Sequence, residues 1–202
     1  MREGYSEHVP APDEHRKTEE FGRFFPEGEV LDTALTEMPD DVQELLEQLG
    51  MRYLDIERYE PGKFHDVQKV TLGPDDAIYV ARKIKEYGDA GTEESTYLVD
   101  HKDGKVAGYG EVRYHLTDES GYFKDKPFVG FTRTGSEHQR SGLAERRLRA
   151  MNALARQKYG KPLYSDTLLS PEARSLWEKL VKEGRARKFS EGEQERFVYE
   201  DQ

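Results

Sequence analysis

The chain has 202 residues, which suits one domain of ordinary size with additions, and its formal net charge is −10 because 41 acidic residues outnumber 31 basic ones. The absence of cysteine excludes disulfides, cysteine–metal sites and a cysteine nucleophile, and no metal site is expected. No apolar stretch approaches the ~18 residues that a membrane span needs, and the chain does not open with the apolar core of a signal peptide. We therefore expect a cytoplasmic protein without membrane contact. The negative net charge argues against general nucleic-acid binding.

The first 35 residues combine many charges and three prolines with little periodicity, so we predict an N-terminal arm over residues 1–35 and a single domain over residues 36–202. Three aromatic residues of the arm form a cluster, namely Phe21, Phe24 and Phe25. This cluster can anchor the arm on its own domain, on a protein partner or on a second copy of the chain. The sequence leaves these alternatives open.

Four elements are predicted in the first half of the domain, and we interpret them as scaffold. A helix over 39–50 has two aspartates in its first turn and a glycine at its end. Alternation of apolar and polar residues predicts strands over 52–59 and 67–72. A second helix is predicted over 74–87, with an apolar stripe at helical spacing formed by Ala77, Val80, Ala81, Ile84 and Tyr87.

The second half begins with a predicted β-hairpin. Strands over 96–101 and 105–116 flank Asp103-Gly104, and an Asp-Gly pair between such segments is a strong hairpin signal. A further strand over 128–134 extends the hairpin into an antiparallel meander.

Two helices and shorter β segments complete the chain. A helix over 143–159 is followed by a short strand over 162–165. Ser170 is a good N-cap for a helix over 171–183, which has proline at its first position and glycine after its end. A closing hairpin pairs two strands, at 187–189 and 196–200.

The loop between strand 128–134 and helix 143–159 reads Gln-Arg-Ser-Gly-Leu-Ala over 139–144. Unpaired amides and the helix dipole favour an anion at a helix start, and glycine lets a ligand approach the backbone closely. Segment 133–161 carries eight basic and two acidic residues, a net of +6, so the rest of the chain sums to −16. These features predict an anion-binding loop; the alternative is a solvated helix face that is rich in arginine.

The string QRSGLA resembles the acyl-CoA-binding signature Gln/Arg-x-x-Gly-x-Gly/Ala of the GNAT superfamily of N-acetyltransferases. Downstream, Ser170-x-x-Ala173-x-x-x-Trp177 resembles the second signature, Asn-x-x-Ala-x-x-x-Tyr, at typical spacing. The resemblance covers an expected acyl-CoA-binding core over 96–202, and the longer string SDTLLSPEARSLWEKL is similar to members that we associate with bacteriophage genomes. It implies a mixed α/β (α+β) fold, in which helices flank a central, mostly antiparallel twisted sheet that splays at the acyl-CoA site.

This resemblance also implies that acetyl-CoA is the co-substrate. Its pantetheine arm would pair with strand 128–134 in the splay beside Tyr164, its diphosphate would bind the loop amides, and its 3′-phosphate would meet Arg133, Arg140 or Arg147. The implied cofactor-binding residues are Thr132, Arg133, Thr134, Gln139, Arg140, Ser141, Gly142, Leu143, Ala144 and Ser170.

Acetyl transfer to an amine needs a base for the amine, a donor for the oxyanion and a proton for the leaving thiolate. Glu111 and Asp166 are the candidate bases, and an ordinary surface or capping carboxylate is the alternative for each. Tyr114 and Tyr164 are candidates for the proton donor. Trp177 stands where the family has a tyrosine thought to protonate the thiolate; because an indole N–H is a poor acid, we interpret Trp177 as core packing.

We therefore predict an N-acetyltransferase that moves an acetyl group from acetyl-CoA to a primary amine of a cationic small molecule or protein. The alternative is an inactive GNAT-fold structural or interaction protein, for example a phage-particle component that binds partners through residues 1–35. A phage-encoded protein would act in the host cytoplasm or in the virion. A nucleotide P-loop is excluded, because no Gly-Lys-Ser/Thr follows the loop.

Overall fold

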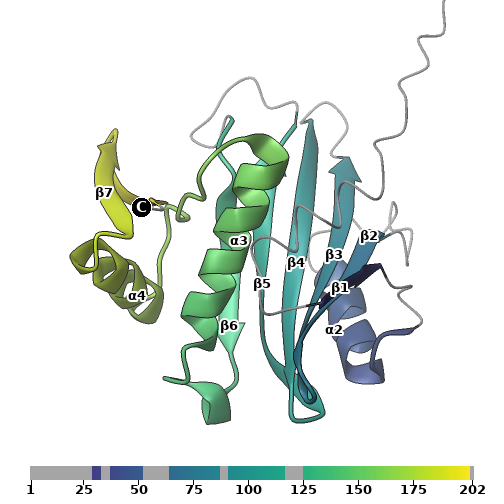
Figure 1. Ribbon diagram of the computed structural model, residues 1–202. Helices are drawn as coiled ribbons and strands as arrows, with labels where there is room; N and C mark the ends of the chain where they lie inside the picture. The colour runs from purple at the N-terminus through teal and green to yellow at the C-terminus, as the bar shows by residue number, and fades with distance from the viewer. Residues whose placement is uncertain (1–28, 33–36, 52–63, 87–90, 117–124, 201–202) are drawn as a thin grey trace, which may run out of the picture.

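The computed structural model describes residues 29–32, 37–51, 64–86, 91–116 and 125–200. Most of the strands lie in the first two thirds of the chain (Figure 1). In chain order the elements are β1 (Glu29–Asp32), α2 (Asp40–Met51), β2 (His65–Gly73), β3 (Asp76–Glu86), β4 (Thr92–Lys102), β5 (Lys105–His115), β6 (Phe128–Thr134), the 3-10 turn η4 (Ser136–His138), α3 (Leu143–Tyr159), α4 (Pro171–Lys182), β7 (Ala186–Glu191) and β8 (Gln194–Tyr199).

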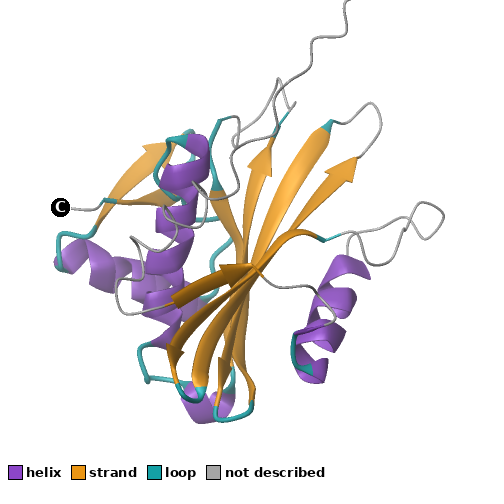
Figure 2. Ribbon diagram, turned by 45° about the vertical axis from the view of Figure 1, so that its right-hand side comes forward, coloured by secondary structure: helices purple, strands orange, loops and turns teal. Residues whose placement is uncertain are grey.

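The first six strands form one antiparallel sheet in sequence order, β1 to β6, and helices cover both of its faces (Figure 2). Helix α2 packs on one face through Val42 and Leu46, and α3 packs on the other through Leu148 and Met151. Helix α4 and the β7–β8 hairpin lie beside α3 and share its core. The predicted mixed α/β fold with a central antiparallel sheet is thus confirmed.

The helix predicted over 74–87 is wrong, because residues 76–86 form strand β3 in the middle of the sheet. Each face of β3 lies against a different core: Ile78 and Val80 face the α3 side, whereas Ala77, Tyr79 and Ala81 face the α2 side. A strand buried on both faces is apolar without alternation, so its sequence lacks the period of two that marks a strand.

Several other predicted elements are confirmed with small shifts at their ends. The first helix is α2, the strand predicted over 67–72 is β2, and the hairpin strands are β4 and β5. At the hairpin tip both Asp103 (φ 53°) and Gly104 (φ 76°) are left-handed, as a tight two-residue turn requires. The strand predicted over 52–59 lies outside the described residues. Within the predicted N-terminal arm, residues 29–32 form the edge strand β1.

Strand β6 is bridged at its beginning to the C-terminal part of the chain. Tyr164, in the segment predicted as a short strand, bridges Phe128 in parallel and Val198 in antiparallel orientation. The amide of Val129 donates to the carbonyl of Tyr164 at 2.9 Å, and the amide of Tyr164 donates to the carbonyl of Pro127 at 2.8 Å. Beyond this bridge, the outer edge of β6 pairs with no other strand in the part of the chain that the structure describes. The sheets therefore separate along β6.

Helix α3 is held on the sheet by a buried ion pair. Arg147 and Asp100 are both fully buried, and Arg147 Nε donates to Asp100 Oδ2 at 2.7 Å. Two glycines of β5 make room for Arg147, since a Cβ at Gly108 would overlap its guanidinium and one at Gly110 would lie 3.1 Å from its Cδ. Arg146 reaches the same carboxylate from the next position, at 2.9 Å.

We predict that Asp100→Asn destabilises the protein by about 3–5 kcal/mol, because removing one partner leaves the buried Arg147 charge uncompensated. Urea unfolding followed by circular dichroism measures this change. The matched control is Asp103→Asn, which also removes one negative charge but lies exposed in a turn where asparagine is equally favourable. Equal stability of the two variants would contradict the assigned role of the ion pair.

Candidate anion-binding site at the start of helix α3

The chain leaves β6 through a short bent loop before α3 begins. Gly135 N still donates to Ala107 O at 2.9 Å, which extends the contact with β5 by one residue, and η4 follows. Arg140 (φ 62°) and Gly142 (φ 85°) then adopt left-handed conformations, and Gly142 is the N-cap of α3. Two left-handed residues so close together turn the chain sharply into the helix.

The first turn of α3 has no side-chain cap. Ser141 Oγ, the nearest hydroxyl, donates to the carbonyl of His138 at 2.5 Å, and the first helical bond runs from Arg146 N to Gly142 O at 2.9 Å. Gly142 is exposed, and a Cβ there would meet nothing within 4 Å. The first amides of the helix therefore have no side-chain acceptor, and they lie at the positive end of the helix dipole, which suits an anion.

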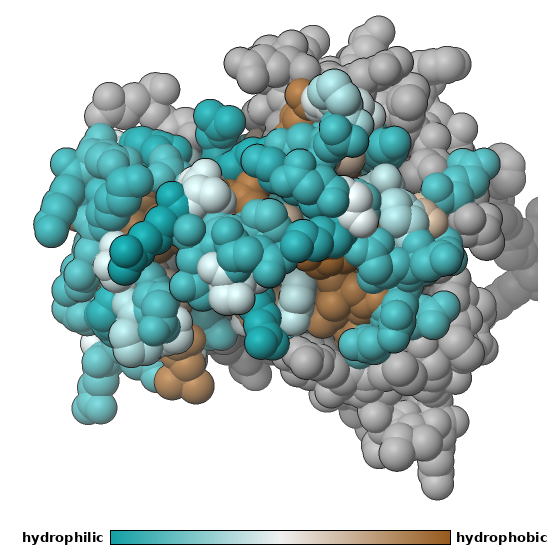
Figure 3. Space-filling view, turned by 90° about the horizontal axis from the view of Figure 1, so that it is seen from below, coloured by the Kyte–Doolittle hydropathy of each residue, from teal (hydrophilic) through white to brown (hydrophobic). Residues whose placement is uncertain are grey.

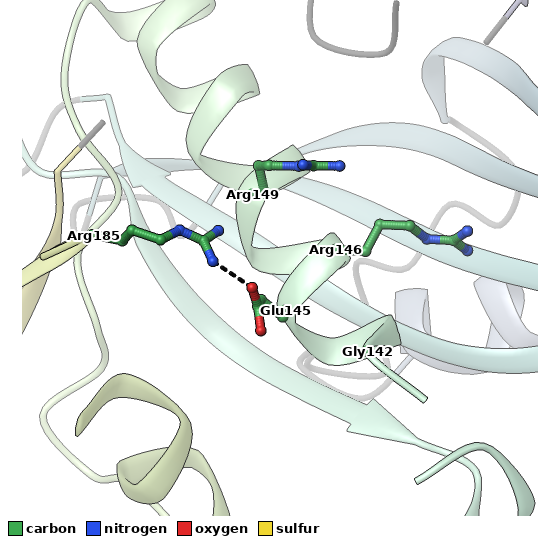
Figure 4. A pocket seen from close by; sticks show the side chains of 5 residues that line it. All are labelled: Gly142, Glu145, Arg146, Arg149 and Arg185. Atoms are coloured by element: carbon green, nitrogen blue, oxygen red, sulfur yellow. Dashed lines mark hydrogen bonds and ion pairs between the residues drawn. The ribbon is translucent and has the colours of Figure 1, made fainter. Parts of the chain in front are cut away.

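A depression of about 240 Å³ adjoins this helix start, and the end of the molecule that contains it is mainly hydrophilic (Figures 3 and 4). Its lining combines three arginines with one carboxylate: Gly142, Glu145, Arg146, Arg149 and Arg185. Arg149 is exposed, whereas Arg146 extends away from Glu145 and pairs with Asp76 and Asp100. The depression is thus cationic and borders the uncapped amides.

Glu145, in the first turn of α3, joins this helix to the C-terminal part of the chain. It pairs with Lys179 of α4 at 2.7 Å and with Arg185, which precedes β7. The hydrogen bond from Lys179 and then that from Arg185 lower the pKa of Glu145, so its carboxylate is ionised at neutral pH. Arg185 also donates to the hydroxyl of Tyr199 at 2.6 Å, which fixes its orientation.

The predicted cofactor-binding residues fall into three groups in space. The loop residues Gln139, Arg140, Ser141 and Gly142 are exposed at the helix start, where Ala144 is half-buried and Leu143 belongs to the core. The strand residues Thr132, Arg133 and Thr134 end β6, next to the loop. Ser170 lies apart from both groups and caps α4, accepting from Ala173 N at 3.2 Å.

Arg147 does not lie where a phosphate contact requires it. Besides Asp100, it donates to Thr132 Oγ1 at 2.6 Å and to Thr134 Oγ1 at 3.5 Å, all beneath the helix. Of the three arginines expected as alternatives for the 3′-phosphate, Arg147 is thus corrected, because it is buried and paired, whereas Arg133 and Arg140 are exposed. The depression itself is lined by Arg149 and Arg185. Arg149 was part of the basic segment in the sequence, but nothing near Arg185 in sequence signals its position.

The two candidate bases have different surroundings. Glu111 is fully buried on the face of β5 opposite α3, and Arg113 Nε donates to its Oε2 at 2.7 Å. Burial, and then the charge of Glu111, raises the pKa of Tyr97, so this phenol stays protonated beside the carboxylate. Asp166 follows Tyr164 and is engaged locally, accepting from Thr167 N at 2.6 Å.

A bulge in β6 brings Glu111 next to that strand. Glu111 pairs with Phe131 and Val112 pairs with Val129, so Gly130 is the additional residue on β6. A Cβ at Gly130 would lie 2.6 Å from Glu111 Oε2, so only glycine lets this carboxylate approach the strand so closely. Glu111 is therefore placed beside the strand whose outer edge is open, which the sequence did not indicate.

The remaining aromatic candidates are engaged in packing. Tyr114 stacks on Tyr159, with centroids 4.0 Å apart, and the Tyr164 ring meets Phe189 edge-on. Trp177 is 2 % exposed and stacks on Phe197 at 5.9 Å, so its predicted role in the core is confirmed.

Among the described residues, no group of three or more His, Cys, Asp or Glu side chains has an arrangement that could hold a metal ion. None of the helices found there is long and apolar enough to cross a membrane.

Comparison with known proteins gives matches among solved structures. A crystal structure of an acyl-CoA N-acyltransferase from Pseudomonas aeruginosa is similar with a TM-score of 0.40 at 14 % identity, and the match covers 86 % of this chain and 99 % of that chain. A scan against protein-family models and a search of curated proteins found no match. At this identity and TM-score, the likeness does not assign an activity to the chain.

We predict that Gly142→Ala lowers the free energy of unfolding by about 1–2 kcal/mol, because a side chain at a left-handed position is strained even where space is open. The matched control is Gly73→Ala, at a position without positive φ whose nearest neighbour to a new Cβ is 4.0 Å away. That variant is expected to be neutral or slightly stabilising, since alanine restricts the unfolded chain. Urea unfolding compares the two, and equal losses would contradict a left-handed Gly142.

Proposed function

We propose that the protein is an acyl-CoA-dependent N-acyltransferase of GNAT type, with acetyl-CoA as the acyl donor and a primary amine as the acceptor. One observation carries the proposal: an uncapped helix start with a cationic depression lies directly after a strand whose outer edge is open. An anionic ligand with an extended, amide-containing arm fits both features at once. The sequence signatures at 139–144 and 170–177 support the same class of ligand.

In this proposal the two ends of coenzyme A use different chemistry. The diphosphate accepts hydrogen bonds from the loop amides between Arg140 and Ala144, where the helix dipole adds to the attraction. The pantetheine arm has amide groups, and it pairs with the outer edge of β6 between the Tyr164 bridge and Thr134 as an added strand would. The thioester then lies near the bulge at Gly130.

Acyl transfer moves one proton from the amine to the leaving thiolate. A free lysine-type ammonium has a pKa of about 10.4, so a base must take its proton before the nitrogen attacks the thioester carbonyl. We assign this role to Glu111, because its carboxylate borders β6 at Gly130. A backbone N–H of β6 stabilises the oxyanion, and water supplies the proton to the thiolate, since the buried indole of Trp177 is a poor acid.

The acceptor is proposed to be cationic. Outside the basic segment 133–161 the chain carries a net charge of −16, which attracts a polyamine, an aminoglycoside-like amine or a lysine-rich protein. We infer no single acceptor from this charge.

Acetyl-CoA is predicted to stabilise the wild-type protein against heat, and Gly142→Glu to abolish the effect by placing a carboxylate among the phosphate-binding amides. At a concentration about 100 times Kd, binding adds about 2.7 kcal/mol and raises Tm by about 5–10 °C. Differential scanning fluorimetry measures the shift.

The control for that experiment is Gly160→Glu. Gly160 ends α3 in the same left-handed conformation (φ 63°), and a Cβ there also meets nothing within 4 Å. The substitution therefore matches the charge and the strain of Gly142→Glu at the opposite end of the helix. No shift for the wild-type protein at millimolar acetyl-CoA, or loss of the shift in both variants alike, would overturn the proposed cofactor site.

Glu111→Gln is predicted to lower kcat by about 10²–10⁴-fold while leaving acetyl-CoA binding unchanged, as removal of a general base does. Thiol release is followed with whichever amine turns over in a screen of polyamines, aminoglycosides and lysine-rich peptides. Asp166→Asn tests the other candidate and is expected to retain activity, because the base is assigned to Glu111 at the Gly130 bulge. Full activity of both variants would contradict a carboxylate base, and binding without turnover of any amine would favour a non-enzymatic role.

A further inference from the structure

The carboxylate of Glu145 occupies the position that a ligand anion would take in the cationic depression. It lines this depression together with Gly142, and in Figure 4 its side chain and that of Arg185 point toward each other. One carboxylate oxygen accepts from Lys179 and the other from Arg185, so both oxygens of Glu145 are engaged by cations from α4 and the segment after it. Helix α3 thus carries its own anion at its N-terminal end.

Arg149 is a further cation that lines the same depression. Arg149 follows Glu145 by one helical turn and is exposed, and no ion pair of Arg149 is found within the described residues. A carboxylate has two oxygens and one negative charge, whereas a phosphomonoester has three terminal oxygens and nearly twice that charge. A diphosphate likewise offers more than a carboxylate, with two negative charges on four non-bridging oxygens. Arg149 and Arg185 line the depression, and Lys179 reaches it through Glu145 Oε2. A phosphate group therefore matches these three cations better than a carboxylate does.

The ion pairs of Glu145 are weak enough to exchange. The side chains of Glu145, Arg185 and Lys179 are 26 %, 31 % and 55 % exposed, and pairs with this much solvent contact contribute little net stability. Arg185 does not lose its orientation when Glu145 leaves, because its Nη2 donates to Tyr199 and its guanidinium lies 5.8 Å from the centroid of the Tyr199 ring. The cation is held in place for an incoming anion.

We propose that Arg149, Lys179 and Arg185 form a phosphate subsite and that Glu145 fills this subsite in the free protein as an internal competitor, which a phosphate group of the ligand displaces. The proposal rests on the proposed function, because the phosphate is supplied there by coenzyme A. Binding then breaks the contacts of Glu145 with α4 and replaces them with contacts to the ligand. The site consequently selects against ligands without phosphate, which cannot compensate for the lost ion pairs.

Isothermal titration of coenzyme A into the wild-type protein, Glu145→Gln and Glu183→Gln tests the competition. Glu183 contacts the same two cations, at 3.6 Å from Lys179 and 3.4 Å from Arg185, but does not line the depression. We expect Glu145→Gln to bind coenzyme A about three- to tenfold more tightly than the wild type, and Glu183→Gln to stay within about twofold of it, as suits partly exposed pairs.

Titration of 3′-dephospho-coenzyme A identifies the phosphate that enters the subsite. If Glu145→Gln also binds this ligand more tightly than the wild type does, the diphosphate enters the subsite. If the increase in affinity disappears with this ligand, the 3′-phosphate enters it. Both results support displacement of Glu145. Coenzyme A binding with no greater gain in Glu145→Gln than in Glu183→Gln overturns the subsite and leaves the proposed function intact. Absence of binding by every variant overturns both.

A second pair of variants keeps the test valid if Glu145→Gln folds poorly. Lys179→Gln removes one cation of the subsite from an exposed position, and Lys182→Gln removes an exposed cation from the last turn of the same helix. We expect a loss of about threefold in coenzyme A affinity for Lys179→Gln alone. Equal affinities of these two variants would count against the subsite.

Discussion

The buried ion pair between Asp100 and Arg147 is the contact on which the geometry of the candidate site depends. It joins β4 to α3 and, through the hydroxyls of Thr132 and Thr134, to the end of β6. A buried pair of charges contributes little net stability compared with an apolar pair of the same size. The main effect of this ion pair is therefore to fix where α3 lies on the sheet. Because the guanidinium can satisfy these partners in only one arrangement, the start of α3 is fixed relative to the end of β6.

That fixed position explains how the loop can remain without a cap. A helix start commonly gains stability from a side chain that accepts from its first amides. Here Ser141 donates to His138 instead, and the helix is held by Arg146 and Arg147 from beneath. The amides are left available without a loss of order in the helix, and the same contacts keep the open edge of β6 beside them.

The sequence predicted the elements whose signals are local and missed those set by distant contacts. The hairpin at Asp103-Gly104, the loop at 139–144 and the cap at Ser170 each depend on neighbouring residues, and all were found. Strand β3 was missed because its pattern depends on burial by α2 and α3 together. Likewise, no local pattern indicates that Arg185 contacts Glu145, which lies 40 positions earlier in the chain. The close approach of the Glu111 carboxylate to Gly130 was missed as well, because it depends on a bulge in β6.

The net charge of the basic segment 133–161 does not by itself show which of its charges are open to a ligand. Its net charge of +6 suggests an open cationic surface, yet Arg146 and Arg147 are neutralised by Asp76 and Asp100 from the sheet, and Lys158 pairs with Glu94. Much of the segment therefore serves to hold α3 on an acidic sheet. Near the helix start Arg149 is exposed, and Glu145 pairs there with two more cations, Lys179 and Arg185. A chain with a net charge of −10 can thus still present a localised cationic site to an anion.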